Sequence, residues 1–210
     1  MNILEEISTY LQKGRSPKVQ ELVAQAMAEG IAPQTILDEG LLAGMGVIGA
    51  KFKNNEVFVP EVLISARAMN KGVEVLKPAL VAQGVESRGT VVLGTVKGDL
   101  HDIGKNLVKL MMEGKGLTVI DLGVDVPPER FLDAARENDA EIVACSALLT
   151  TTMGEMKTIV ETIRSSDISD QVKIMVGGAP VTQTFADQIG ADYYTADAES
   201  AAQLAVSLVS

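Results

Sequence analysis

Residues 90–116 read TVVLGTVKGDLHDIGKNLVKLMMEGKG, and this stretch decides the fold of the larger part of the chain. It starts with TVVLGTV, a short apolar run with β-branched residues, which is typical of a buried strand. Beyond a glycine-containing loop, apolar side chains recur at helical spacing until Gly114 or Gly116, at Ile103, Leu107, Leu110 and Met111. A buried strand followed by a loop and an amphipathic helix is the repeating unit of a parallel α/β sheet.

The same alternation continues along the rest of the sequence. We expect further strands at 117–123, 141–147, 172–178 and 192–196. We expect helices at 127–138, 152–164 and 181–188, and one more at the C-terminus. Five strand–helix alternations favour a parallel sheet that is covered on both faces. The sequence therefore predicts an α/β domain with a flavodoxin-like, doubly wound, five-stranded parallel sheet of strand order 2-1-3-4-5.

The first 80 or so residues read as helix only. Ser16 and Pro17 are a good N-cap and first helical residue, a third helix begins near Pro33, and a fourth begins near Val59. Four helices with short connections predict a small bundle. We place this four-helix bundle at residues 1–84 and the sheet domain at residues 85–210. Residues 77–89 contain Pro78 and two glycines, which favours a tether between the two domains.

Composition excludes several classes of protein. The formal charge of −10 argues against a nucleic-acid partner, because phosphate binding needs clustered Lys and Arg. The single cysteine, Cys145, excludes an internal disulfide framework and a Cys-rich zinc site. The N-terminus lacks the pattern of a signal peptide, and no apolar run approaches membrane-spanning length. We expect a soluble, cytoplasmic protein that does not bind a membrane.

His101 is the only histidine, and it lies in the loop that follows the first strand of the predicted sheet. In an open α/β sheet, ligands bind beyond the carboxyl ends of the strands, where the strand order reverses. For order 2-1-3-4-5 this place lies between the first and third strands, where the loop KGDLHDIGKN, 97–106, meets the segment SALLTTTM, 146–153. The loop GGAP, 177–180, follows the fourth strand and would let a bulky ligand approach its backbone.

Asp99 and His101 form a chemically reasonable pair. A carboxylate that accepts one imidazole N–H fixes the tautomer and leaves the other nitrogen for a metal. One histidine cannot hold zinc, but it can be the axial ligand of a metal that a macrocycle already chelates. Gly98 and Gly104 would keep the loop thin where a large ring lies flat. The alternative for His101 is a capping or surface residue, and for Asp102 we prefer the role of a helix N-cap.

Three separated elements resemble the signature of cobalamin-binding domains that bind the corrinoid with its own base displaced: Asp99-x-His101-x-x-Gly104, then after about 41 residues Ser146-x-Leu148, and after about 28 more Gly177-Gly178. Methionine synthase, the corrinoid mutases and the corrinoid proteins of methyltransferases share this signature. The stretch EVFVPEVLISARAMNKG, 56–72, resembles the helical cap of the same family, so the resemblance covers essentially the whole chain. The chain looks like a methyltransferase-associated corrinoid protein, similar to the corresponding part of methionine synthase.

The resemblance implies a role for each matching residue. His101 would be the lower axial ligand of cobalt, with Asp99 hydrogen-bonded behind it and Thr152 as the third member of this relay, where methionine synthase has serine. The resemblance also implies cofactor contacts in the His101 loop, along the nucleotide tail and around the displaced base, by Gly98, Leu100, Asp102, Ile103, Gly104, Ser146, Leu148, Thr150, Gly177, Gly178, Tyr194 and Ala196. In the cap, the candidates that would shield the upper face of the corrin are Phe58, Val59, Leu63 and Met69. Helix capping by Thr152, a plain strand-end turn at Gly177 and Gly178, and ordinary core packing of the cap residues stay open as alternatives.

The function that the resemblance implies is that of a corrinoid methyl carrier, which is not catalytic alone. Cobalamin or a related corrinoid would cycle between cob(I)alamin and methylcob(III)alamin. One partner, a substrate-specific methyltransferase, would supply the methyl group from an aryl methyl ether, a methylamine, methanol or glycine betaine. A second methyltransferase would pass it to tetrahydrofolate or to a thiol such as coenzyme M, and a reductive activator protein would restore inactive cobalt. The main alternative is a cobalamin-dependent sensor; a mutase subunit and a receiver domain without cofactor rank lower.

Overall fold

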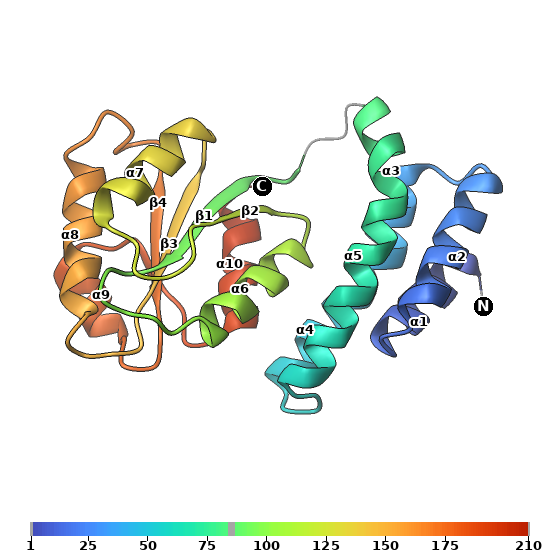
Figure 1. Ribbon diagram of the computed structural model, residues 1–210, viewed down its shortest axis with the longest axis horizontal. Coiled ribbons are helices and arrows are strands. Elements are labelled where there is room, and N and C mark those ends of the chain that lie inside the picture. The colour runs from blue at the N-terminus through green and yellow to red at the C-terminus, as the bar shows by residue number, and fades with distance from the viewer. Residues whose placement is uncertain (1, 84–86, 210) are drawn as a thin grey trace. The chain divides into compact units, whose positions relative to one another are not determined.

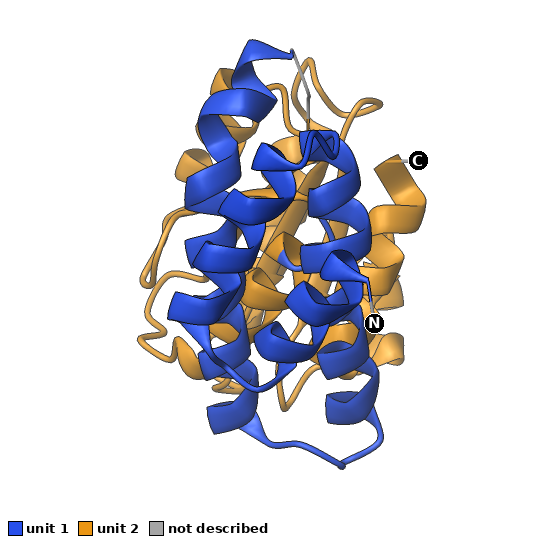
Figure 2. Cartoon of the chain, turned by 90° about the vertical axis from the view of Figure 1, so that its right-hand side faces the viewer, with its two compact units in different colours: residues 1–86, 114–116 blue, residues 87–113, 117–210 orange. Residues whose placement is uncertain are grey.

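The computed structural model describes residues 2–83 and 87–209. The chain divides into two compact units, residues 1–86 with 114–116 and residues 87–113 with 117–210, which Figure 2 colours separately. The first unit is helical and the second contains the sheet. In the part of the chain that the structure describes, no helix is both long and apolar enough to cross a membrane.

The helical unit contains the expected four-helix arrangement. Its helices run along α1 Ile3–Gln12, α2 Ser16–Ala28, a third rod made of α3 Pro33–Thr35, η1 Ile36–Leu42 and α4 Ala43–Lys53, and α5 Val59–Ala82. The third rod begins at Pro33 as predicted, but its middle segment, η1, is a π-helix, which the apolar spacing did not indicate. The core of the unit is aliphatic, with fully buried Ile7, Leu11, Val19, Leu41 and Leu76.

The prediction that the tether starts at residue 77 is wrong, because α5 continues through Lys77 to Ala82 and contains Pro78. Proline lacks the N–H that would bind the carbonyl of Glu74, so it costs the helix a hydrogen bond. The helix nevertheless continues, because α5 packs against α2 and its buried residues extend to Leu76, two residues before the proline. The remainder of the predicted tether, and the predicted boundary between residues 84 and 85, lies largely at residues 84–86, outside the described residues.

The second unit is a five-stranded parallel sheet in the predicted order, β2-β1-β3-β4-β5. Its strands are β1 Thr90–Thr95, β2 Thr118–Asp121, β3 Ile142–Ser146, β4 Lys173–Gly177 and β5 Tyr193–Tyr194. Its helices are α6 Ile103–Glu113, α7 Pro128–Glu137, α8 Met153–Arg164, α9 Gln183–Ile189 and α10 Ala198–Val209. Figure 1 shows α7, α8 and α9 on one face of the sheet and α6 with α10 on the other. The doubly wound architecture is therefore confirmed.

The register of the central strands positions the loops that follow them. Thr95, the last residue of β1, is the partner of Ser146, the last residue of β3. The next pair along is Ser146 with Gly177, which ends β4. Because these three strands end level with one another, the loops after them lie at one edge of the sheet. The order reverses between β1 and β3, and this is the edge at which open α/β sheets bind ligands.

Candidate functional site

The site is centred on Asp99 and His101, in the loop between β1 and α6. His101 Nδ1 lies 2.6 Å from Asp99 Oδ1, and the backbone N–H of His101 donates to the same oxygen at 3.1 Å. The carboxylate is completely buried, whereas the imidazole is 49% exposed. Because Nδ1 faces a carboxylate oxygen, it carries the proton, and Nε2 is left with its lone pair. Within residues 2–83 and 87–209, Nε2 has no hydrogen-bond partner.

The second oxygen of Asp99 ties this loop to the loop after β3. Asp99 Oδ2 accepts the backbone N–H groups of Leu148 at 2.8 Å and Leu149 at 3.2 Å. It also accepts the hydroxyl of Thr152, which is buried, at 2.9 Å. Asp99, His101 and Thr152 are thus joined in one hydrogen-bonded chain, although Thr152 lies 53 residues after Asp99 in the sequence.

The hydrogen bonds decide the charge of Asp99. Burial by itself raises the pKa of a carboxyl group, because it removes water from the charged form. Here the N–H of Leu148, the ring and backbone N–H groups of His101 and the hydroxyl of Thr152 outweigh that effect, so the pKa of Asp99 lies well below its usual range. The carboxylate is therefore ionised at any pH near neutrality, and the imidazole is held by a charge-assisted hydrogen bond.

Two further residues position the loop, and sequence reasoning missed both. The buried hydroxyl of Thr95 donates to the carbonyl of His101 at 2.9 Å, which fixes the backbone of the ligand residue itself. Asp125, in the loop after β2, accepts the N–H of Gly98 at 2.7 Å. A hydroxyl at the last position of an otherwise apolar strand was the available signal for Thr95. Asp125 carried no such signal, because its contact depends on how β1 and β2 pair.

The structure also decides between alternatives that the sequence left open for two polar residues. Thr152 precedes α8 but makes no side-chain cap there, because its hydroxyl is directed at Asp99 and at the carbonyl of Leu149, which lies at 2.9 Å. Asp102 precedes α6 and its carbonyl accepts the N–H of Asn106, as an N-cap carbonyl does. Its carboxylate accepts the side chain of Asn106 at 3.1 Å, and among the described residues it accepts no backbone N–H, so the side-chain cap that we expected does not form there.

Exposed apolar side chains surround His101. Leu100 is 72% exposed, Ile103 is 74% exposed and Leu148 is 43% exposed, although large apolar residues usually face the core. A Cβ at Gly104 would meet nothing within 4 Å, so the packing of the described residues does not require glycine there. A solvent-facing apolar surface with one imidazole at its centre is the surface that a flat macrocycle with an axial metal ligand requires.

The two glycines at the end of β4, Gly177 and Gly178, differ in what an added Cβ would contact. A Cβ at Gly178 would lie 1.9 Å from the carbonyl oxygen of Ala147, and the φ of Gly178 is +131°, so the fold itself requires glycine at this position. A Cβ at Gly177 would approach only the carbonyl oxygen of Thr195, at 3.5 Å, which is ordinary contact. Gly178 therefore allows the close approach of two loops, whereas the packing of the described residues does not require glycine at position 177.

The other candidates of the sheet domain lie at the same edge or beside it. Ser146 ends β3 and is half-buried, and Thr150 is exposed in the loop that follows. Tyr194 ends β5 and packs partly against the core of the sheet domain, and Ala196 is exposed two residues later.

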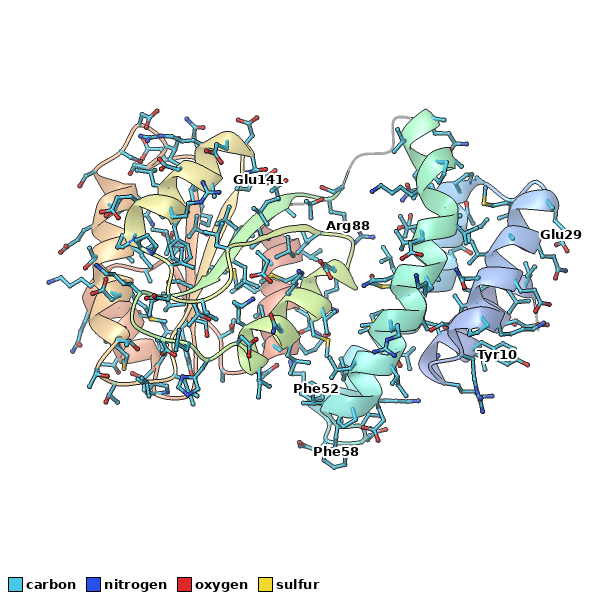
Figure 3. The ribbon with its side chains drawn as sticks, in the orientation of Figure 1. Tyr10, Glu29, Phe52, Phe58, Arg88 and Glu141 are labelled. Carbon is cyan, nitrogen blue, oxygen red and sulfur yellow. The ribbon has the colours of Figure 1, made fainter. Side chains whose placement is uncertain are left out.

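The four cap candidates differ in exposure. Phe58 is 63% exposed and Leu63 is 46% exposed, whereas Val59 is half-buried. Figure 3 shows Phe58 at the end of the unit where α4 ends and α5 begins. Met69 is 2% exposed and lies on the buried face of α5, one turn from Ala66 and Gly72, so it contributes to the core of the helical unit. Met69 thus takes the alternative role, and the two exposed residues remain the strongest candidates.

The residues present fit a metal that brings most of its ligands with it. Within the described part of the chain, no group of three or more His, Cys, Asp or Glu side chains could hold a metal ion. His101 is a single imidazole with a fixed tautomer, half-exposed in an apolar surface. A corrin ring would bring most of the ligands of its cobalt with it, so His101 is the one ligand that the protein would have to supply.

Comparison with known proteins agrees with this chemistry. Residues 89–206 match the family model of the B12 binding domain, and residues 3–77 match a second B12 binding domain model. The chain is 40% identical to a corrinoid protein of Desulfitobacterium hafniense over 98% of this chain and 96% of that protein. It is 47% identical to trimethylamine corrinoid protein 1 of Methanosarcina acetivorans, over 83% of this chain and 82% of that protein.

A solved structure matches the fold over nearly the whole chain. It belongs to the methanol:cobalamin methyltransferase complex MtaBC from Methanosarcina barkeri, with a TM-score of 0.89 and 32% identity over 99% of this chain and 79% of that one. The two family models together cover both units, and the relatives match across them. The chain therefore belongs to the family of cobalamin-binding corrinoid proteins of methyltransferase systems, and its cofactor is a cobalamin-type corrinoid.

Proposed function

We propose that this corrinoid protein is a methyl carrier that shuttles between two methyltransferases, with His101 as the lower axial ligand of its cobalt. The observation that carries the proposal is the fixed imidazole: the buried Asp99 holds Nδ1 at 2.6 Å, and the side chain of His101 is 49% exposed. When bound, the corrinoid supplies a cobalt centre that can take up and release a methyl group. Residues 1–84 act as its cap and residues 85–210 as its main binding domain.

The protein's own residues hold and adjust the axial nitrogen. His101 would offer Nε2 to the metal, and Asp99 keeps the ring in the tautomer that leaves this lone pair free. Thr152 shares the carboxylate with His101, so the strength of its hydrogen bond sets how much negative charge faces the imidazole. Leu100, Ile103 and Leu148 would cover the apolar face of the ring and exclude water from it.

The names of the relatives suggest the methyl donor. Trimethylamine and dimethylamine corrinoid proteins are 47% and 40% identical to this chain, and the solved relative belongs to a methanol methyltransferase complex. The donor of this protein is therefore a methylamine or methanol, delivered by a substrate-specific methyltransferase. The acceptor is tetrahydrofolate or a thiol such as coenzyme M, served by a second methyltransferase, and a reductive activator restores the cobalt. The location we propose is the cytoplasm, as expected from the sequence.

The ligand role is tested with the reconstituted holoprotein. Wild type that is loaded with hydroxocobalamin and reduced to Co(II) should give an EPR spectrum with splitting from one axial nitrogen. With the histidine isotopically labelled with ¹⁵N, the splitting must change, because the chain has one histidine. His101→Gly should lose this signature and release the corrinoid more readily. An unchanged spectrum in His101→Gly would exclude His101 as the ligand.

The carrier role needs a separate measurement. Reduced holoprotein is mixed with methyltransferases for trimethylamine, dimethylamine, monomethylamine and methanol, each with its substrate, and methylation is read from the absorption spectrum. We expect methylation with one of them and none without enzyme. If the holoprotein keeps its histidine-bound spectrum but none of these enzymes methylates it, the proposed donors are wrong and the sensor becomes the favoured function.

A further inference from the structure

The loop after β2 is built into the loop that carries His101. β1 and β2 pair regularly from Thr90 with Thr118 to Leu93 with Asp121. The next pairing is a bridge between Val96 and Val126, so the β2 side contains two more residues than the β1 side between these pairs. A bulge of this kind interrupts a ladder and directs a side chain away from it, and bulges are frequent beside functional sites.

Asp125 is the residue that the bulge directs towards the loop. Its φ is +54°, a left-handed conformation that few residues other than glycine, asparagine and aspartate adopt. Its Oδ1 accepts the N–H of Gly98 at 2.7 Å, and its own N–H donates to the carbonyl of Asp99 at 3.0 Å. The two bonds hold the backbone on both sides of Asp99, at the peptide between Lys97 and Gly98 and at the carbonyl of Asp99 itself.

The first of these bonds selects one form of a turn. The N–H of Asp99 donates to the carbonyl of Val96 at 3.1 Å, and Gly98 occupies the third position with φ of +79°, as in a type II turn. Glycine also adopts the negative φ of a type I turn, in which the peptide unit between Lys97 and Gly98 is flipped. In the flipped form the carbonyl of Lys97, and not the N–H of Gly98, would face the carboxylate of Asp125. Electrostatic repulsion between these oxygens disfavours that form.

We infer that Asp125 is a positioning residue, which locks the turn at residues 96–99 in the form that places Asp99 under His101. It acts through Gly98 and Asp99 and touches neither the imidazole nor the exposed apolar surface. The inference rests on the proposed role of His101 as the axial ligand. The loop after β2 thus takes part in the ligand relay, together with the loops after β1 and β3.

Three variants separate the contact from general loop effects. Asp125→Gly removes the acceptor and keeps a residue that suits the left-handed backbone. Asp125→Asn tolerates this backbone and keeps an acceptor oxygen for the N–H of Gly98, but its NH₂ group can also donate to the carbonyl of Lys97 in the flipped turn, so it should recover only part of the effect. Asp139→Gly is the matched control, because Asp139 is also exposed, has a φ of +47°, and its carboxylate makes no hydrogen bond within the described residues. If Asp125→Gly does not fold, Asp125→Ser, which has a shorter side chain, replaces it.

The first readout uses the protein without cofactor. Because the chain has one histidine, a ¹⁵N-labelled imidazole gives one set of signals, and an Nδ1 proton bonded to a carboxylate appears far downfield. We expect this proton in wild type, Asp125→Asn and Asp139→Gly. In Asp125→Gly it should exchange with water about fivefold faster, the effect of one net hydrogen bond on the closed form of the loop.

The second readout uses the Co(II) holoprotein, in which the ratio of histidine-bound to unbound corrinoid is measured by EPR. We expect this ratio to fall about fivefold in Asp125→Gly and by less in Asp125→Asn. If Asp125→Gly equals wild type in both readouts while His101→Gly loses the nitrogen splitting, the inference is wrong and the proposed ligand stands. Equal losses in Asp125→Gly and Asp139→Gly also overturn it. An unchanged spectrum in His101→Gly would overturn the ligand assignment itself.

Discussion

The carboxylate of Asp99 can be tested by Asp99→Asn, which keeps the size of the side chain and replaces one oxygen by NH₂. In the wild type, Oδ1 accepts two donors from His101, and Oδ2 accepts Leu148, Leu149 and Thr152. The amide can turn its NH₂ towards either group, but both groups consist of donors. Because Asp99 is completely buried, the donors that then face NH₂ find no water in place of the lost acceptor.

The cost follows from the number of bonds. A net hydrogen bond to a charged group contributes roughly 1.5–3 kcal/mol, and a buried donor without an acceptor costs a similar amount. At least two donors lose their acceptor and the remainder lose the charge, so the free energy of unfolding should fall by about 4 kcal/mol. The measurement is urea unfolding of the protein without cofactor at pH 7. Asp102→Asn is the control on the other side of His101, and it should change the free energy by less than about 0.5 kcal/mol, because Asp102 is exposed.

The same pair of proteins predicts a dependence on pH. The pKa of Asp99 lies well below its usual range in the folded protein, so the folded state favours the charged form. The contribution of this group to stability is complete above the pKa of the unfolded chain, about 3.9, and it is lost as the pH falls towards the folded value. The difference in unfolding free energy between wild type and Asp99→Asn should therefore be largest at pH 7 and shrink below about pH 4. A difference that stays constant down to pH 3 would refute the reasoning.

Five more substitutions, at four positions, test the relay and its surroundings. Thr152→Val should lower the free energy of unfolding by about 1.5 kcal/mol and weaken the histidine-bound EPR signature, whereas Thr152→Ser, which keeps the hydroxyl, should retain both. Lys105→Met should cost about 2 kcal/mol in urea unfolding, because Lys105 is 2% exposed and lies 2.6 Å from Asp121. Asp121 is partly exposed and keeps other partners, which places the cost below the range for fully buried pairs. Gly178→Ala should cost about 4 kcal/mol or prevent folding, because its Cβ would lie 1.9 Å from a backbone oxygen, whereas Gly177→Ala should fold and, if the ligand reaches Gly177, bind corrinoid less tightly.

The fold was predictable because it depends on local patterns that recur. Apolar runs such as the one at β1 are long enough to be buried, and the helices between them have one apolar face, so the order of the elements indicates the sheet. The pattern could not indicate where tertiary packing overrides the local preferences of the sequence. Pro78 ends a helix by local rules, yet α5 continues to Ala82. The π-helix in the third rod, η1, likewise has no local sequence signal among its seven residues.

The candidate site was predictable to the extent that its residues are distinctive. A lone histidine two residues from an aspartate, at the place where the strand order reverses, pointed to Asp99 and His101 before any coordinates. Asp125 was not predicted, because nothing in the sequence distinguishes it. Aspartate is common in loops, and its role depends on the two extra residues between the pairing of Leu93 with Asp121 and the bridge at Val126. Such a register change is a property of two strands together, so neither strand alone reveals it.

For Thr152, the structure adds a second hydrogen-bond acceptor that the sequence did not indicate. Its hydroxyl has one proton and two acceptors at 2.9 Å, the carboxylate of Asp99 and the carbonyl of Leu149. Near neutral pH the ionised acceptor is preferred, because charge-assisted hydrogen bonds are about twice as strong as neutral ones. A rotation of the hydroxyl alone transfers the bond to Leu149, and no heavy atom has to move. The relay can therefore give Asp99 one donor more or fewer without a change of fold, and a valine at this position would remove that adjustment while keeping the shape of the side chain.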